Sequence, residues 1–101
     1  MKLIWSPTEV KQLSEIVDYI SEDSPIQAEK WADRILNAVE QLTDYPKSGR
    51  IVPEINEEKI REIISGNYRI IYEIEDTCIS ILTIRHSKRM MDKDKITESD
   101  D

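Results

Sequence analysis

Apolar residues recur at intervals of three and four through the first half of the chain, a spacing typical of amphipathic helices. The first helical segment carries them at Val10, Leu13, Ile16, Val17 and Ile20. The second segment carries them at Ala28, Trp31, Ala32, Ile35, Val39 and Leu42. Each segment follows a serine and a proline, Ser6-Pro7 and Ser24-Pro25, which suit the cap and the first helical position. We therefore expect two helices, the second ending near Tyr45-Pro46 because proline excludes the helical conformation from the residue before it.

The second half of the chain changes to β-branched and aromatic residues, which favour strands. Three segments are rich in isoleucine, tyrosine and threonine: Ile60–Ile64, Tyr68–Ile74 and Cys78–Arg85. Ser65-Gly66-Asn67 separates the first two segments, and glycine and asparagine tolerate the positive φ of a tight turn. A short apolar run at Lys2–Trp5 predicts a further strand that joins this sheet.

Two capped helices joined by a short link predict an antiparallel hairpin, whose apolar faces need the sheet as a partner. The sequence thus predicts an α+β fold, with an N-terminal strand, an antiparallel two-helix hairpin and a three-stranded antiparallel meander packed against the helices. We interpret Lys47–Pro53 as a loop and Glu54–Lys59 as a charged connector. Ser87–Asp101 is almost wholly polar and predicts a partly disordered segment, with a turn of helix near Met90-Met91. The domain would span residues 1–89 and the tail residues 90–101.

Side chains alternate between the two faces of a strand, so the first turn decides which residues share a face. With Gly66-Asn67 as the two loop residues, Arg61 opposes Tyr72 on the neighbouring strand. The predicted core face then carries Ile63, Ile70, Tyr72 and Ile74, with Arg61 near its margin. The opposite face carries Glu62, Arg69 and Glu73 together with Ile60, Ile64 and Ile71. The hairpin around Glu75-Asp76-Thr77 leaves two registers open: an even loop places His86 on the Arg69 face, and a three-residue loop places it on the other.

Charge and cysteine content narrow the class of protein. The net charge of −7 argues against broad, non-specific binding of nucleic acid, although basic residues gather after the last strand. The single cysteine, Cys78, excludes a disulfide framework and a cysteine-based zinc site. No apolar run is long enough for a signal peptide or a membrane span. We expect a cytoplasmic protein without a metal or another cofactor.

Few residues are candidates for chemistry. The single histidine, His86, could act as a general acid or base or contact a phosphate, or could simply bond a backbone carbonyl at the strand end. Arg61 and Arg69 lie on neighbouring strands and could bind phosphate, or could equally pair with Glu62, Glu73 or Glu54. Glu54 is a weaker candidate for a base, the alternative being an exposed surface carboxylate. No spacing of acidic residues marks a metal site or a pair of catalytic carboxylates.

Several short motifs in the second half of the chain are informative in combination. They are Tyr45-Pro46 with Gly49-Arg50 and Val52-Pro53-Glu54, then Ile60–Ile63, then Asn67–Ile74, and finally Ile81–His86 followed by Arg89. Together with the order of helices and strands, they resemble toxins of the RelE/ParE superfamily, which belong to type II toxin–antitoxin modules. The likeness extends over most of the chain and is greatest to the ParE and plasmid-stabilisation branch.

The resemblance implies one of two activities. ParE-type toxins bind and poison DNA gyrase and are not known as enzymes, whereas RelE-type toxins are endonucleases that cut mRNA in the ribosomal A site. In a RelE-type enzyme, the resemblance implies that Arg69 binds the scissile phosphate, with Arg61 near a second basic position. It also implies that His86 moves protons, while Glu54 is a looser match to a carboxylate of some members. A ParE-type toxin would instead bind its target through the basic residues Arg85, His86, Lys88 and Arg89.

Two departures from the nuclease pattern favour the ParE-like interpretation. The chain has no tyrosine near its C-terminal end, where several nucleases have one, and it is acidic where ribosome-binding members are strongly basic. Growth inhibition through binding of a protein such as gyrase is therefore the first hypothesis. Ribosome-dependent mRNA cleavage is the alternative, and an inactive remnant that only binds an antitoxin is the third, so enzymatic activity remains open. All three imply a cognate antitoxin, bound along the helix hairpin and the sheet in a hetero-oligomer.

Overall fold

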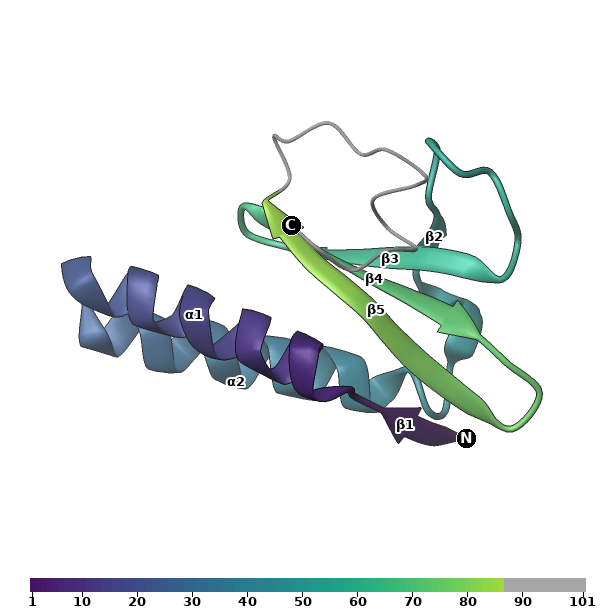
Figure 1. Ribbon diagram of the computed structural model, residues 1–101, viewed down its shortest axis with the longest axis horizontal. Coiled ribbons are helices and arrows are strands. Elements are labelled where there is room, and N and C mark those ends of the chain that lie inside the picture. The colour runs from purple at the N-terminus through teal and green to yellow at the C-terminus, as the bar shows by residue number, and fades with distance from the viewer. Residues whose placement is uncertain (87–101) are drawn as a thin grey trace.

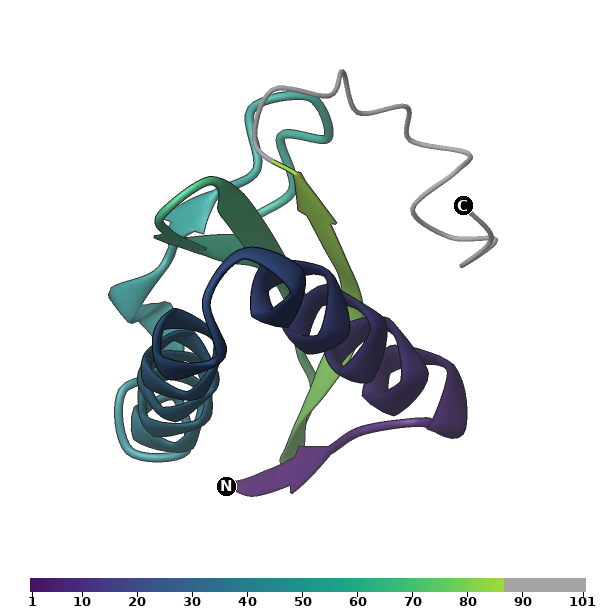
Figure 2. The same cartoon turned by 90° about the vertical axis from the view of Figure 1, so that its left-hand side faces the viewer.

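A computed structural model describes residues 1–86, which form two long helices on one face of a five-stranded sheet (Figures 1 and 2). The elements in chain order are β1 (Lys2–Ile4), α1 (Pro7–Asp23), α2 (Pro25–Gln41), the 3₁₀ helix η1 (Pro46–Ser48), β2 (Arg50–Ile51), β3 (Ile60–Ser65), β4 (Tyr68–Ile74) and β5 (Cys78–His86). The strand order across the sheet is β1-β5-β4-β3-β2, with β1 parallel to β5 and every other pair antiparallel. Lys88, Arg89, the helical turn expected near Met90-Met91 and the tail all lie outside the described residues.

The predicted α+β class, the helix hairpin and the N-terminal strand are confirmed, but the three-stranded meander is incomplete. Strand β2 lies inside the segment Lys47–Pro53, which was predicted to be a loop. It pairs with β3 through Arg50 opposite Glu62 and Ile51 opposite Arg61. A strand of two residues is too short to show alternation, so no sequence pattern could have identified it.

Both helices begin where the serine–proline pairs predict. The Glu9 carboxylate of α1 accepts hydrogen bonds from the Ser6 hydroxyl and from the Ser6 N–H, the latter at 3.2 Å. In α2, the Ser24 hydroxyl oxygen accepts from the Gln27 N–H at 3.2 Å. These side chains satisfy amide groups that a helix N-terminus leaves without partners, which fixes the start of each helix.

The predicted end of α2 near Tyr45-Pro46 is wrong, since the α-helix stops at Gln41. Tighter turns follow it, with hydrogen bonds from Thr43 N–H to Glu40 C=O and from Asp44 N–H to Gln41 C=O. Proline only forbids helix immediately before itself, and it does not require the helix to reach that position.

The main core lies between the helices and the face of the sheet that was predicted to be buried. Its fully buried members are Trp31, Ile35, Val39, Leu42, Ile70, Tyr72, Ile79, Ile81 and Ile84, with Ile63 and Ile74 packed at the edge. Strands β3 and β4 pair in the predicted register, with Ser65 opposite Tyr68 and Arg61 opposite Tyr72. The Gly66-Asn67 turn therefore decided both the register and the face of each side chain, as expected.

A second, smaller cluster covers part of the opposite face, called here the far face. Val52, Ile55, Ile60 and Ile71 are buried there, with Leu82 packed against them. The connector predicted to be merely charged therefore supplies Ile55 as a core residue. This second cluster keeps water away from the middle of the sheet on a face that also carries charged side chains.

The hairpin between β4 and β5 combines both registers that the sequence left open. Ile74 pairs with Ile79, and this even spacing by itself would place His86 on the Arg69 face. A β-bulge then inserts Leu82 into β5, so that Ile71 pairs with Thr83 and Tyr68 with His86. Because one extra residue reverses the alternation, His86 lies on the helix side of the sheet and Arg85 on the far face.

Tyr72 joins the sheet to the segment that follows α2. Its buried hydroxyl donates to the Pro46 carbonyl at 2.7 Å and accepts from the Gly49 N–H at 3.0 Å. Gly49 leaves no room for a side chain, because a Cβ there would lie 2.5 Å from the Tyr72 hydroxyl oxygen and 2.6 Å from the Glu62 carbonyl oxygen. Glycine is therefore needed at this position so that the backbone before β2 can lie close to Tyr72 and β3.

We expect Gly49→Ala to lower the free energy of unfolding by about 1–3 kcal/mol, because the added methyl group must push either a buried tyrosine or the β3 backbone aside. Urea denaturation followed by circular dichroism would measure the change. Gly66→Asn is the matched control: nothing lies within 4 Å of that position, and asparagine tolerates its positive φ of 59° at a cost of no more than about 1 kcal/mol. Equal losses in the two variants would contradict the assigned role of Gly49.

Candidate functional site

The far face of the sheet carries a cluster of ion pairs around one carboxylate. The Glu62 side chain is completely buried, and its two oxygens accept from Arg50 Nε at 2.5 Å and from Arg69 Nε at 2.6 Å. Strand pairing explains the arrangement, because β2 brings Arg50 opposite Glu62 and β4 carries Arg69 close by. A buried carboxylate needs such partners, since an unpaired charge would be strongly disfavoured there.

Arg69 is engaged on its other side by Glu54. The two terminal nitrogens of its guanidinium donate to the two Glu54 oxygens, each at 2.9 Å, while only 6% of the Arg69 side chain is exposed. The hydrogen bonds with Arg69 lower the pKa of Glu54, and the same pairing raises the pKa of Arg69. Glu54 therefore stays ionised, and Arg69 makes three hydrogen bonds to carboxylates in a fork geometry that suits arginine.

Arg61 serves the backbone of neighbouring segments. Its side chain donates to the carbonyl of Glu58 at 2.9 Å and to that of Gly49 at 3.0 Å. These bonds tie the end of the β2–β3 connection to the residue that precedes β2. Arg61 lies on the side of β3 opposite Glu62, as its alternation predicts.

His86 and Arg85 end the described chain on opposite faces. The His86 ring meets the Tyr68 ring edge-on, with centroids 5.4 Å apart and the planes at 72°. Tyr68 in turn packs on Trp31 at 5.2 Å. Arg85 pairs in register with Arg69 and is buried. The remaining predicted target-binding residues, Lys88 and Arg89, lie beyond residue 86.

The three residues proposed for catalysis are thus not gathered in one place. Arg69 lies on the far face, His86 lies on the helix side, and Arg61 holds backbone carbonyls. The structure does bring Glu54 and Arg69 together, in the ion pair that the sequence left open as an alternative to phosphate binding. A phosphate could reach the Arg69 guanidinium only if Glu54 moved away.

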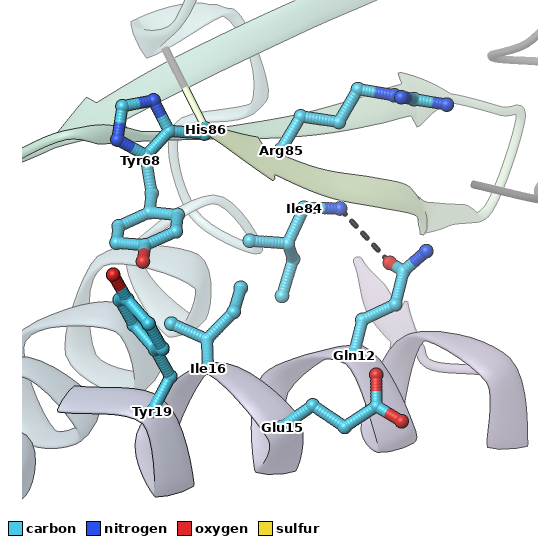
Figure 3. Close-up of a pocket in the computed structure, with 8 residues that line it drawn as sticks. All are labelled: Gln12, Glu15, Ile16, Tyr19, Tyr68, Ile84, Arg85 and His86. Atoms are coloured by element: carbon cyan, nitrogen blue, oxygen red, sulfur yellow. Dashed lines mark hydrogen bonds between the residues drawn. The ribbon is translucent and has the colours of Figure 1, made fainter. Parts of the chain in front are cut away.

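A pocket of about 540 Å³ lies between α1 and the ends of β4 and β5 (Figure 3). It is lined by Gln12, Glu15, Ile16, Tyr19, Tyr68, Ile84, Arg85 and His86. The Gln12 side-chain oxygen accepts from the Ile84 N–H at 3.0 Å, which satisfies part of the free edge of β5. The pKa of Tyr68 is raised, mainly by burial and to a smaller extent by the neighbouring Tyr19. The Tyr68 hydroxyl therefore keeps its proton and remains a donor at neutral pH.

Sequence reasoning missed the pocket and the central role of Glu62. One signal was present for the pocket: Tyr19 falls outside the apolar stripe of α1 and is 66% exposed, and such an aromatic side chain often marks a contact surface. Glu62 was expected as a possible partner of the strand arginines, but no signal indicated its complete burial, because glutamate is rarely buried.

The described residues offer no site for a metal ion. Across residues 1–86, no three histidine, cysteine, aspartate or glutamate side chains come together in a way that could hold one. Within the same range, neither helix is both long enough and apolar enough to cross a membrane.

Comparison with known proteins gives consistent matches along the chain. The sequence profile of the family described as "ParE toxin of type II toxin-antitoxin system, parDE" matches residues 3–91. The toxin RelE2 of Caulobacter vibrioides is 31% identical over 90 residues, covering 88% of this chain and 98% of the relative. A further relative from Sinorhizobium fredii is 33% identical over 88 residues, covering 85% of this chain and 88% of the relative.

The fold itself also has a solved counterpart. A chain of the chromosomal ParDE toxin–antitoxin system from P. aeruginosa superposes with a TM-score of 0.70 over 87% of this chain and 97% of that one. At 22% sequence identity, this likeness concerns the fold alone.

We expect Arg69→Ala to lower the free energy of unfolding by about 3–5 kcal/mol, because it leaves the buried Glu62 with one partner instead of two. Guanidinium chloride denaturation would measure the loss. The control is Lys59→Ala, which removes a surface pair with Glu73 at 3.3 Å and should cost less than about 1 kcal/mol. If both variants lost less than about 1 kcal/mol, the buried cluster would not have the importance assigned to it.

The lowered pKa of Glu54 predicts how acid affects stability. Because the native pKa lies below the unfolded value of about 4.3, the pair with Arg69 contributes fully above that value and is lost as the pH falls through the native pKa. The difference in unfolding free energy between the wild type and Glu54→Gln should therefore be largest near pH 7 and shrink below about pH 4. Urea midpoints measured from pH 7 to pH 3 test this, and a difference that does not change with pH would contradict it.

Proposed function

The chain belongs to the ParE toxin family of type II toxin–antitoxin systems, and from this premise we propose that it inhibits growth by binding a protein target, with DNA gyrase as the candidate. The observation that carries the proposal is that the Arg69 guanidinium is already bonded to carboxylates of the same chain. This residue would have to hold the scissile phosphate in a nuclease, but its guanidinium is bonded to Glu54 and Glu62. A toxin that acts by binding needs no such phosphate site.

The position of His86 supports the same choice. A nuclease that used Arg69 for the phosphate and His86 for proton transfer would need both within reach of one ribose. The bulge in β5 places them on opposite faces of the sheet. In this arrangement, Arg69 and His86 could not both contact the same ribose. General acid–base catalysis requires its acid or base to lie within hydrogen-bond distance of the reacting group.

The basic residues after β5 remain the proposed contact with the target. His86 ends the described strand beside a pocket, and Arg85, Lys88 and Arg89 belong to the same stretch of sequence. Cationic and aromatic residues suit binding to a protein surface, where arginine and tyrosine contribute strongly. His86→Ala should therefore weaken toxicity without affecting the fold of the core.

A cognate antitoxin is the second partner that we propose. Both helices keep large apolar side chains in contact with solvent: Val10, Tyr19, Ile26 and Leu36 are 51%, 66%, 65% and 48% exposed. Exposed apolar side chains of this size favour association with another chain. The solved counterpart of this fold is a ParDE toxin–antitoxin system, and we expect the antitoxin of this chain to cover the helix hairpin.

Expression in a bacterial host, with DNA synthesis and protein synthesis followed separately, tests the proposed mechanism. We expect DNA synthesis to fall first. The informative variant is the double substitution Glu62→Leu/Arg69→Met, which removes both charges and keeps the volume, so the fold should tolerate it. It should remain as toxic as the wild type if Arg69 has no catalytic role.

Other outcomes would reject this proposal in distinct ways. An early loss of protein synthesis that the double variant abolishes would indicate mRNA cleavage instead. Normal growth during production of a folded wild-type protein would indicate an inactive remnant. Circular dichroism of each purified variant serves as the control for folding.

A further inference from the structure

The pocket beside His86 combines an apolar floor with an aromatic rim. Ile16 from α1 and Ile84 from β5 line its apolar part, and the side chains of Tyr19 and Tyr68 meet end to end at one side. Figure 3 shows the two tyrosine hydroxyls directed toward each other, with the His86 ring above Tyr68. A long side chain could lay its methylene groups on the two isoleucines and bring its end group to the rings.

One carboxylate, Glu15, lines the pocket, and it belongs to an acidic helix. Glu15 lies one helical turn before Tyr19 on α1, so both face the same side. Helix α1 carries five carboxylates, Glu9, Glu15, Asp18, Glu22 and Asp23, and a single lysine, Lys11. Arg85 lines the pocket, but its guanidinium points away from the tyrosines, and its register with Arg69 directs it to the far face (Figure 3).

We infer that this pocket holds a lysine or arginine side chain from the antitoxin, an inference that rests on the proposed function. The cation would lie against the tyrosine rings, which attract positive charge through their π faces. The Tyr68 hydroxyl oxygen and the Glu15 carboxylate supply acceptors for its N–H groups. The surrounding apolar side chains on α1 and α2 would contact the rest of the same partner segment.

The acidic character of the helices makes a basic partner segment the best match. An acidic side chain would meet the Glu15 carboxylate, and like charges at close range are unfavourable. A leucine would fill the floor but leave the tyrosine hydroxyls and the carboxylate dehydrated without new partners. A long cationic side chain satisfies the floor and the rim together.

Titration of the purified full chain with N-acetyl-arginine methylamide, followed by NMR, tests the inference without any need to know the antitoxin. We expect saturable shifts of the Tyr19, Tyr68 and His86 ring signals. The matched probe is N-acetyl-citrulline methylamide, which has nearly the same shape without the charge and should bind about two- to fivefold more weakly. Glu15→Gln should weaken binding of the arginine probe by a similar factor, while Glu29→Gln on α2 should leave it unchanged.

Tyr19→Ala provides a second test, since this side chain is largely exposed and its loss should not disturb folding. It should also weaken binding of the arginine probe. Equal binding of the two probes, or shifts that do not saturate, would overturn the inference. These measurements do not depend on toxicity, so growth arrest without probe binding would reject the pocket assignment and leave the proposed function intact.

Discussion

A single buried carboxylate organises the far face of this sheet. Glu62 has no exposed side-chain surface, and its charge is tolerated only because Arg50 and Arg69 both donate to it. Those two partners come from β2 and β4, the strands on either side of Glu62, so the ion pairs hold three neighbouring strands in register. Through Arg69, the same network fixes Glu54 and hence the segment that connects β2 to β3.

This network also limits what the far face can do. An arginine that is almost fully buried and shared by two carboxylates stabilises structure, and it can bind an outside anion only in competition with Glu54. The buried apolar cluster beside it lowers the local access of water, which strengthens the pairs further. On the far face, the charge of Arg69 is therefore balanced by two carboxylates of the same chain.

The bulge at Leu82 gives the two ends of β5 different surroundings. Before it, alternate residues such as Ile79 and Ile81 face the helices, and after it the alternation restarts one residue later. The result places Ile84 in the main core and His86 at the rim of the pocket beside α1. His86 thus lies near the helix hairpin, where apolar side chains are also exposed, and not near the buried Arg69 on the far face.

The sequence by itself determined the start of each helix and the first hairpin turn, which depend on local chemistry. Helix starts followed from serine and proline at the caps, and the β3–β4 register followed from the Gly66-Asn67 turn, because these preferences act over a few residues. The motifs around Gly49-Arg50, Arg69 and His86 were sufficient to identify the family. Only the tertiary structure decided the two-residue strand β2, the bulge in β5 and the burial of Glu62. Each of these depends on how neighbouring strands pair and pack, which the pattern within one segment does not record. The faces on which Arg69 and His86 lie were therefore decided by register, since one inserted residue in a strand exchanges the face on which every later side chain lies.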